Sequence, residues 1–235
     1  MSTKNEGPFK DAIDFFYPRN CVACACVLTR QEVNICLECK TTLPRTNFHL
    51  IKENPISKVF WGRVPIEWAT AYFYFAKESR VQKLLHHIKY LGFKDLGYEV
   101  GQWLGDDLKL NSSLASDLDF IVPVPLHPKK QHKRGYNQSE LLADGIADSL
   151  DKKLNINNLV REIHSPTQTK KSRFKRWENV KDIFQLKDAN EFNGSHVLLV
   201  DDVITTGSTI EACCHTLLQC HQIKISIASI AYVAY

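Results

Sequence analysis

Short apolar runs alternate with amphipathic segments in this chain from residue 119 onward. Apolar runs bounded by turn residues predict buried strands, and apolar positions spaced three and four apart predict helices. The predicted strands cover residues 119–125, 157–164, 181–186, 196–202 and 224–235, and the predicted helices cover 139–150 and 208–220. Strands that alternate with helices in this way are typical of an α/β fold, a parallel sheet flanked by helices.

The residues before 119 follow a different pattern. The aromatic run 64–76 predicts one bent strand or a hairpin, and helical spacing of apolar residues predicts helices over 79–92 and 94–110. The serine-rich stretch 111–117 reads as a polar break, and residues 18–47 are too short and too polar to hold a core of their own. We therefore divide the chain into a small N-terminal module (1–47), a connecting strand with helices (48–118) and a core domain (119–235).

One stretch of the core, VLLVDDVITTGSTIEACC from Val197 to Cys214, carries recognisable chemistry. A buried strand runs into Asp201 and Asp202, and the carboxyl ends of strands are where open α/β sheets bind ligands. The loop Thr205–Thr209 then leads into a helix, and Gly207 lets its backbone amides approach a phosphate. The acid pair suits the vicinal hydroxyls of a sugar or a Mg²⁺ beside it. A ribose that carries a 5′-phosphate would match both the acid pair and the phosphate-binding loop.

A plainer interpretation of the same stretch is a helix cap. Ser208 or Thr209 would then cap the helix, and the two acids would be ordinary loop residues. The apolar run, the acid pair, the threonines and the glycine occur together, and that combination favours the ligand site.

Two basic segments precede this stretch in the sequence. Residues 126–138 hold Lys129, Lys130, Lys133 and Arg134 beside two histidines, and 169–180 hold Lys170, Lys171, Arg173, Lys175 and Arg176 against one acid. Cations interleaved with aromatic side chains suit single-stranded DNA, through phosphate pairing and base stacking. A merely solvated basic surface is the alternative for both segments.

Five of the eight cysteines lie in the N-terminal module. Two Cys-x-x-Cys hooks, formed by Cys21 with Cys24 and Cys36 with Cys39, have the spacing of a tetrahedral Zn²⁺ site, which we expect to be structural. Cys26 could replace Cys24 as a ligand or remain a spare thiol. The other three cysteines, between Cys213 and Cys220, are expected to be buried as small apolar residues.

Composition narrows the class of protein only slightly. The 235 residues carry a formal charge of +4, which is too small to support a nucleic-acid claim without local patches. The chain has no apolar run long enough to span a membrane, and its first residues lack the apolar core of a signal peptide. The expected location is therefore the cytoplasm, where paired disulfides are not expected.

The stretch VLLVDDVITTGST resembles the sequence fingerprint of type I phosphoribosyltransferases. The four-cysteine module, VPVPLHPKKQHKRGYNQSELLA, TQTKKSRFKRWENVKDIF and this stretch follow one another in an order that resembles the ComF family of competence-associated proteins, from about Tyr17 to the end of the chain. Ala25 departs from that pattern, because a glycine often follows the first Cys-x-x-Cys of such zinc ribbons.

The resemblance implies a ligand and a set of roles. The ligand is 5-phosphoribosyl-1-pyrophosphate with Mg²⁺: Asp201 and Asp202 hold the ribose hydroxyls and act as catalytic residues, and Thr205, Thr206, Gly207, Ser208 and Thr209 hold the 5′-phosphate. The first basic segment occupies the place of the pyrophosphate loop, with Arg134 and Gly135 as the expected contacts. The second basic segment lies where the family has a mobile flap. The acceptor of a phosphoribosyl transfer is not readable from the sequence.

Three functions follow from this resemblance. The first is a phosphoribosyltransferase that acts in DNA uptake and natural transformation. The second is a non-catalytic accessory protein that binds single-stranded DNA through Lys129, Lys130, Lys133, Lys170, Lys171, Arg173 and Arg176. The third is a docking protein whose zinc ribbon contacts a competence helicase or other uptake proteins.

Overall fold

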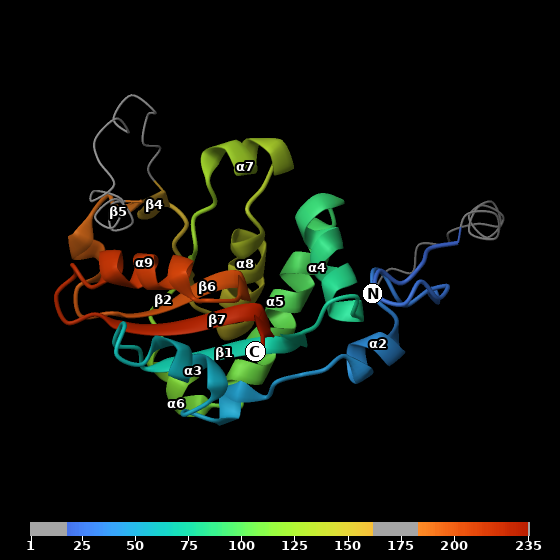
Figure 1. Cartoon of the computed structure of the whole chain (residues 1–235), viewed down its shortest axis with the longest axis horizontal. Helices are drawn as coiled ribbons and strands as arrows, with labels where there is room; N and C mark the ends of the chain where they lie inside the picture. The colour runs from blue at the N-terminus through green and yellow to red at the C-terminus, as the bar shows by residue number, and fades with distance from the viewer. Residues whose placement is uncertain (1–17, 162–182, 235) are drawn as a thin grey trace.

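The computed structural model describes residues 18–161 and 183–234. Its centre is a five-stranded sheet in the order β1-β7-β6-β2-β3 (Figure 1). All four neighbouring pairs are parallel, which confirms the predicted parallel α/β fold. The strands are β1 (Trp68–Phe75), β2 (Phe120–Pro123), β3 (Lys153–Leu154), β6 (His196–Ile204) and β7 (Lys224–Val233).

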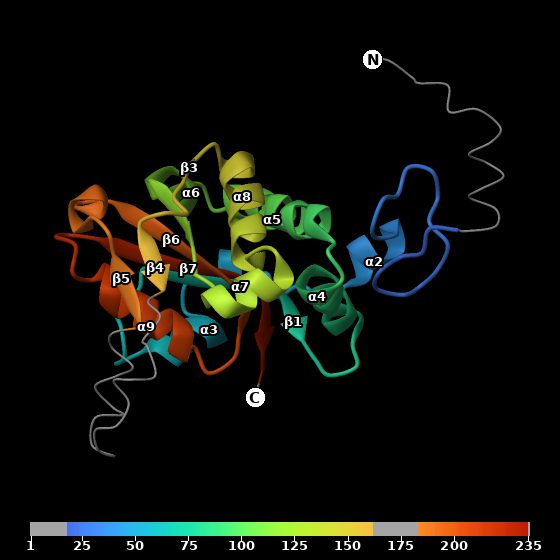
Figure 2. The same cartoon turned by 90° about the horizontal axis from the view of Figure 1, so that it is seen from above.

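Helices cover both faces of the sheet, as the view from above shows (Figure 2). The first five residues of β6 are all buried, because helices cover both faces of the sheet. Burial on both faces explains why the sequence of this strand is a continuous apolar run from Val197 to Val200. One face carries α4 (Arg80–Tyr90), α5 (Lys94–Lys109), α6 (Ser112–Asp117) and α8 (Gln138–Leu150). The other face carries α3 (Pro55–Phe60) and α9 (Ser208–Leu217).

Helices α5 and α8 pack at very close range. A Cβ added at Gly101 would overlap the carbonyl oxygen of Leu142, and one at Gly145 would overlap that of Tyr98. Only glycine allows backbones to approach this closely. The contact fixes α8, and with it the residues at the start of α8 that face the carboxyl end of β6.

Strand β1 belongs to the segment 48–118, yet it pairs with β7 in the sheet of the core. The aromatic run that contains it forms a single strand and not a hairpin. Its outer edge is covered by the chain near Arg45, because the N–H of Thr46 donates to Tyr72 and the N–H of Tyr74 donates to Pro44. This cover protects the edge from pairing with another chain.

Some expected loops are helical. Residues 111–117, predicted to be a break, form α6, whose cap Asn111 accepts from the N–H of Leu114. The basic segment contains α7 (Pro128–Arg134), which begins with proline and ends at Gly135 in a left-handed conformation. A proline at the start and a glycine just past the end are ordinary helix signals, and the many charges of this segment masked them. The short helices α2 (Leu37–Thr42), η1 (Phe48–Leu50), α3 and η5 (Ala189–Phe192) were not predicted.

The predicted strands 157–164 and 181–186 correspond in part to β4 (Leu159–Arg161) and β5 (Phe184–Leu186). These pair antiparallel in a sheet of their own. Cys213, Cys214 and Cys220 are buried, as predicted. Among the described helices, none is long and apolar enough to cross a membrane.

Candidate functional site

The acid pair lies within β6, near its carboxyl end. Asp201 and Asp202 are half-buried, and β6 continues past them to Ile204, alongside β7. One Asp201 oxygen accepts from the hydroxyl of Ser139 at 3.1 Å and from the N–H of Asp202 at 2.8 Å. Burial, and then the charge of Asp202, raise the pKa of Asp201 to about 7.

The next residues form an open loop at the start of α9. Thr205, Thr206, Ser208 and Thr209 are exposed, whereas Gly207 is buried. Gly207 is the cap of the helix, and no side chain caps its first turn. The alternative interpretation, in which Ser208 or Thr209 caps the helix, is therefore excluded. The first N–H groups of α9 are left free of side-chain caps, and such groups form a ready site for an anion.

Gly207 is required for two reasons. Its φ is +74°, in the left-handed region that favours glycine. A Cβ at this position would also lie 2.9 Å from Cε1 of Phe60, at the end of α3. Helix α3 therefore forms the floor beneath the loop.

Arg63 fixes the same loop from the segment that follows α3. One of its guanidinium nitrogens donates to the carbonyl of Thr206 at 2.9 Å and to that of Val59 at 3.1 Å. The other pairs with the carboxylate of Glu211 in α9, which lowers the pKa of Glu211. Arg63 thus ties the loop and the helix behind it to α3, across 143 residues of sequence.

A cation from α4 reaches the acid pair. The ammonium nitrogen of Lys89 lies 2.8 Å from a carboxylate oxygen of Asp202, and both side chains are about four-fifths buried (exposed fractions 21% and 19%). Lys89 is in the last turn of α4, where the helix dipole favours a positive charge. The acid pair therefore has a resident counter-charge.

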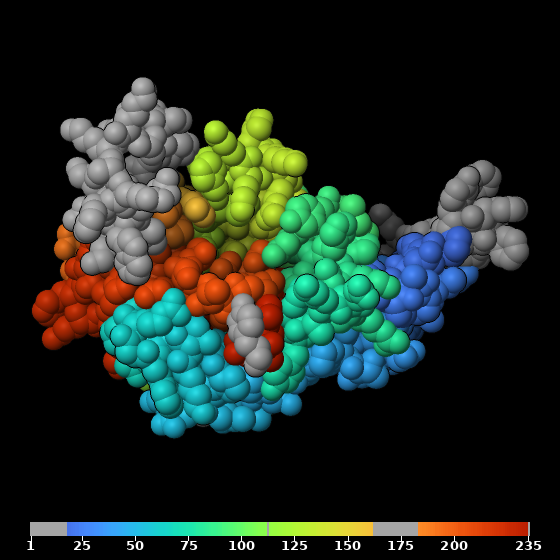
Figure 3. Space-filling model, viewed as in Figure 1, coloured from blue at the N-terminus to red at the C-terminus, as the bar shows by residue number. Residues whose placement is uncertain are grey.

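Lys89 also lines a hollow of about 350 Å³ between the end of α4 and α7. Figure 3 shows these two segments rising side by side from the same part of the molecule. The hollow has four cationic side chains and, among its described lining residues, no carboxylate. The residues that line it are Lys89, Tyr90, Gly92, Lys130, Lys133, Arg134 and Tyr136.

The walls of this basic hollow are tied together. Arg134 donates to Gln138 at 2.7 Å and to the hydroxyl of Tyr90 at 3.3 Å, and its guanidinium lies 4.9 Å from the Tyr90 ring centre. The hydroxyl of Tyr136 donates to the carbonyl of Ile88 at 2.5 Å. An anion that enters the hollow would therefore meet preformed donors.

The cysteine module brings its thiols together. The sulfurs of Cys21, Cys24, Cys26 and Cys36 lie within 4.8 Å of one another, and those of Cys24 and Cys36 are 3.7 Å apart. Four sulfurs around one Zn²⁺ at about 2.3 Å would be about 3.8 Å apart, so this donor set fits zinc. Backbone N–H groups support it: that of Cys36 donates to the sulfur of Cys21, and that of Cys39 to the sulfur of Cys36, each at 3.4 Å.

Cys39 lies beside the same group. Its burial, and then its interactions with Cys24, Cys36 and Cys21, raise the pKa of its thiol. Cys26 is exposed and interacts with Cys24 and Cys36. The four sulfurs that the structure brings within 4.8 Å of one another include that of Cys26, whereas the sequence predicted Cys39 as the fourth ligand.

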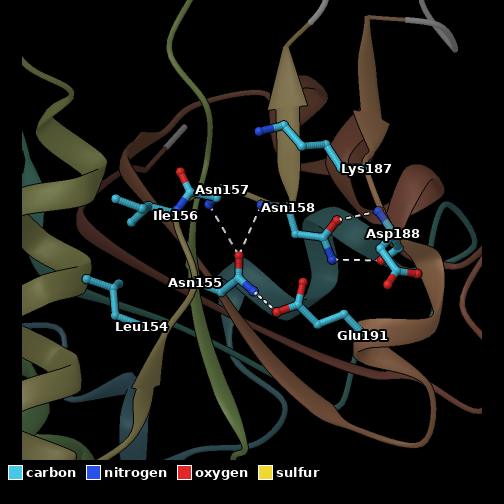
Figure 4. Close-up of a pocket in the computed structure, with 8 residues that line it drawn as sticks. All are labelled: Leu154, Asn155, Ile156, Asn157, Asn158, Lys187, Asp188 and Glu191. Atoms are coloured by element: carbon cyan, nitrogen blue, oxygen red, sulfur yellow. Dashed lines mark hydrogen bonds between the residues drawn. The ribbon is translucent and has the colours of Figure 1, made fainter.

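A second hollow, of about 360 Å³, lies where β3 leads toward β4 (Figure 4). The side chains of Asn155 and Asn158, which line it, already have partners. Asn155 donates to Glu191 at 2.7 Å and accepts from the N–H groups of Asn157 and Asn158, while the Asn158 amide exchanges two hydrogen bonds with the backbone of Asp188. These hydrogen bonds connect β4 and η5 to the end of β3, so the asparagines of this hollow have a structural role.

Comparison with known proteins agrees with this geometry. Residues 137–234 match the family described as phosphoribosyl transferase domain. Competence protein F of Haemophilus influenzae is 46% identical over 94 residues, which are 39% of this chain and 41% of that protein. The DNA utilization protein YhgH of Salmonella typhimurium is 29% identical over 201 residues, 85% of this chain and 84% of that protein.

These matches make the chain similar to the competence-associated proteins of the ComF family. The match to competence protein F spans less than half the length of that relative. A solved allosteric regulatory enzyme of purine biosynthesis is 18% identical, with a TM-score of 0.40, over 61% of this chain and 30% of its own. The match of residues 137–234 and the all-parallel central sheet agree with the parallel α/β fold of type I phosphoribosyltransferases, and the N-terminal cysteine cluster is compatible with a zinc ribbon.

Many of the site residues named from sequence lie near one another. Asp201 and Asp202 adjoin Thr205–Thr209, and Arg134 lines the same hollow as Lys89, the ion-pair partner of Asp202. Gly135 is the left-handed residue that ends α7, and its N–H donates to Gln131. Lys129, Lys130 and Lys133 are exposed on α7, and only the latter two line the hollow. Lys170, Lys171, Arg173 and Arg176 lie outside the described residues.

Sequence reasoning missed four contributors to the site: Phe60, Arg63, Lys89 and Ser139. Three of them lie in the segment 48–118, which carries no phosphate-binding or acidic motif. Ser139 alone had a local signal, because it is at the start of a predicted helix that follows a basic segment.

Proposed function

We propose that this protein binds 5-phosphoribosyl-1-pyrophosphate together with Mg²⁺. The observation that carries the proposal is the position of the acid pair, which lies between an uncapped helix N-terminus and a basic hollow. A ribose with a phosphate on C5 and a pyrophosphate on C1 has matching chemistry: anionic groups at both ends and vicinal hydroxyls between them.

Each part of the site has a proposed role. Asp201 and Asp202 would accept hydrogen bonds from the ribose 2′- and 3′-hydroxyls. The backbone N–H groups and hydroxyls of Thr205–Thr209 would bind the 5′-phosphate, since the loop is exposed and its helix is uncapped. Arg134 and the backbone at Gly135 would bind the pyrophosphate.

Mg²⁺ fits these donors, because it prefers carboxylate oxygens combined with substrate phosphates. When bound, the ion would supply Lewis-acid chemistry at the pyrophosphate oxygens. The chain's own share would be to orient the ribose with the two aspartates and to offset positive charge that develops at C1 as pyrophosphate leaves. The reaction class we propose is phosphoribosyl transfer to an acceptor still to be identified.

Calorimetric titration of 5-phosphoribosyl-1-pyrophosphate with Mg²⁺ tests the proposal directly. The wild type should bind, and Asp201→Asn/Asp202→Asn should lose binding, because both carboxylates that receive the diol are neutralised. Released pyrophosphate, measured in the presence of candidate acceptors, would extend the result to catalysis. If the wild type does not bind, the acid pair and the loop are a retained scaffold without this ligand-binding function.

Single-stranded DNA binding is the second candidate function. It is favoured by the exposed lysines of α7, Lys129, Lys130 and Lys133, and by the relatives named for competence and DNA utilization. Binding through phosphate contacts should weaken steeply with salt. Changing these three lysines to glutamate should remove it, and the same change to Lys170, Lys171 and Arg173 tests the second basic segment. Absence of binding at low salt would exclude this function.

For the N-terminal module, residues 1–47, we propose a structural zinc site formed by Cys21, Cys24, Cys36 and Cys39, with Cys26 beside it. The module would stabilise this end of the chain or dock a competence helicase or another uptake protein. Deletion of residues 1–47 should then abolish capture of that partner without changing ligand binding. We propose the cytoplasm as the location, because thiols are kept reduced there.

A further inference from the structure

Lys89 occupies a place in the site that no motif assigns to it. Its ammonium lies 2.8 Å from Asp202, and the same side chain lines the basic hollow with Lys130, Lys133 and Arg134. It is therefore the cation shared by the carboxylate that would hold the ribose hydroxyls and the hollow that would hold an anion. Its α4 turn is held by the Tyr136 hydroxyl, which donates to Ile88, and by Arg134, which contacts Tyr90.

The ion pair puts Lys89 in competition with a sugar. A diol that binds Asp202 needs carboxylate lone pairs, and one of these oxygens already accepts from Lys89. An ammonium displaced from a part-buried carboxylate loses a charge-assisted hydrogen bond, which is a substantial loss unless another anion replaces it. Lysine has a long, flexible stem, so the displaced ammonium can move into the adjoining hollow.

Ribose 5-phosphate and its C1-pyrophosphate derivative would then differ in whether they offer the displaced Lys89 ammonium a new partner. Ribose 5-phosphate brings a diol to Asp202 but no anion for the hollow, so it would leave the displaced ammonium without a new partner. A ribose that also carries pyrophosphate on C1 would bring that partner, since the hollow lies next to Asp202. The empty site is thus biased against the sugar that lacks the pyrophosphate.

We infer that Lys89 is the specificity-determining residue by which the site distinguishes a ribose 5-phosphate that carries a C1 pyrophosphate from one that does not. In the empty site it neutralises Asp202, and in the loaded site it binds the pyrophosphate. The inference rests on the proposed function, because it needs the acid pair to bind ribose.

Calorimetry with two ligands tests this role at a fixed Mg²⁺ concentration. Wild type, Lys89→Met and Lys89→Arg are each titrated with 5-phosphoribosyl-1-pyrophosphate and with ribose 5-phosphate. Lys89→Met should weaken binding of the pyrophosphate ligand by at least about tenfold, the loss expected for one charge-assisted hydrogen bond. It should leave binding of ribose 5-phosphate unchanged or tighter, because Asp202 is freed. Lys89→Arg should keep the preference.

Lys83→Met is the matched control, since Lys83 lies on the same helix and is exposed. It should change neither affinity. If Lys89→Met misfolds, Lys89→Gln keeps the test open, because glutamine retains a polar side chain of similar length. Equal weakening of both ligands, or of neither, overturns the inference while leaving the proposed function intact. A wild type that binds neither ligand overturns both.

Discussion

The ring of Phe60 lies so close to Gly207 that a Cβ added at that position would be only 2.9 Å from the Cε1 atom of the ring. This contact joins helix α3 to the loop that begins α9, so the shape of the loop depends on residues far away in the sequence. Because the loop is both exposed to solvent and packed from below, it can present its N–H groups without a side-chain cap.

Gly207→Ala should destabilise the protein by about 2–4 kcal/mol. A left-handed φ costs alanine about 1 kcal/mol or more, and the clash with Phe60 adds an overpacking cost of about 1–3 kcal/mol. Urea unfolding measures the difference. Gly62→Ala is the control, because Gly62 also has a positive φ but has open space where the Cβ would be. Equal losses in the two variants would show that Phe60 does not restrict the loop.

Arg63→Ala should weaken binding of ribose 5-phosphate by about tenfold, since the carbonyl of Thr206 and the start of α9 lose the cation that positions them. Arg63→Lys should restore part of the affinity. Glu211→Gln separates the two contacts of the guanidinium, because it removes the ion pair and leaves the bond to Thr206. We expect it to have the smaller effect. Titration calorimetry gives the three affinities, and an unchanged affinity in Arg63→Ala would exclude a positioning role.

Asp201 should make the folded protein less stable as pH rises. Its pKa is raised to about 7 in the fold, while an unfolded aspartate titrates near 4, so between about pH 4 and 7 the folded state holds more protons. The free energy of unfolding should therefore fall across this window, by up to about 1.4 kcal/mol per pH unit from this group. Below pH 4 and above pH 7 its contribution is constant.

Asp201→Asn tests that linkage, because the neutral amide keeps an oxygen that can accept from Ser139 and from the N–H of Asp202. Relative to wild type, the variant should gain stability at pH 8 and show little gain at pH 4.5, as measured by urea unfolding at both pH values. Other carboxyls titrate in the same range, so the informative quantity is the difference between the two proteins. A difference independent of pH would contradict the raised pKa.

The zinc module should tolerate the loss of either flanking cysteine. Cys26 and Cys39 both lie beside the shared group of Cys21, Cys24 and Cys36, so each can supply the fourth sulfur. Cys26→Ser and Cys39→Ser should each retain about one zinc per chain, and the double variant should lose it, by analysis of the metal content of the purified protein. Complete loss in Cys39→Ser alone would show that the fourth ligand is fixed.

The turn between these cysteines gives a separate prediction. Ala25 has a φ of +65°, where a glycine would be unstrained, and its N–H donates to the carbonyl of Cys21. Ala25→Gly should therefore stabilise the module by up to about 1 kcal/mol. The rate at which a chelator removes zinc should fall in this variant. A faster release would show that the loss of chain stiffness outweighs the strain.

The sequence by itself determined the parts of this protein whose physics is local. The run Val197–Val200, the acids Asp201 and Asp202 and the loop around Gly207 are contiguous, so a strand, its carboxyl end and a phosphate-binding turn could be read in order. The two Cys-x-x-Cys hooks could be recognised for the same reason, because the residues of each hook are close together in the sequence. The helix signals of α7, although local, were hidden by its charges.

Tertiary structure alone decided what completes the site. Four contacts depend on how separate segments pack: the ion pair of Lys89, the hydrogen bonds of Arg63, the contact of Phe60 with the loop and the approach of Cys26 to the other thiols. Lys89 and Phe60 have ordinary roles within their own helices, one in a last turn and one in an apolar stripe. Only the docking of α3 and α4 beside the end of β6 brings them to the ligand site, because packing joins residues that no periodicity or motif relates.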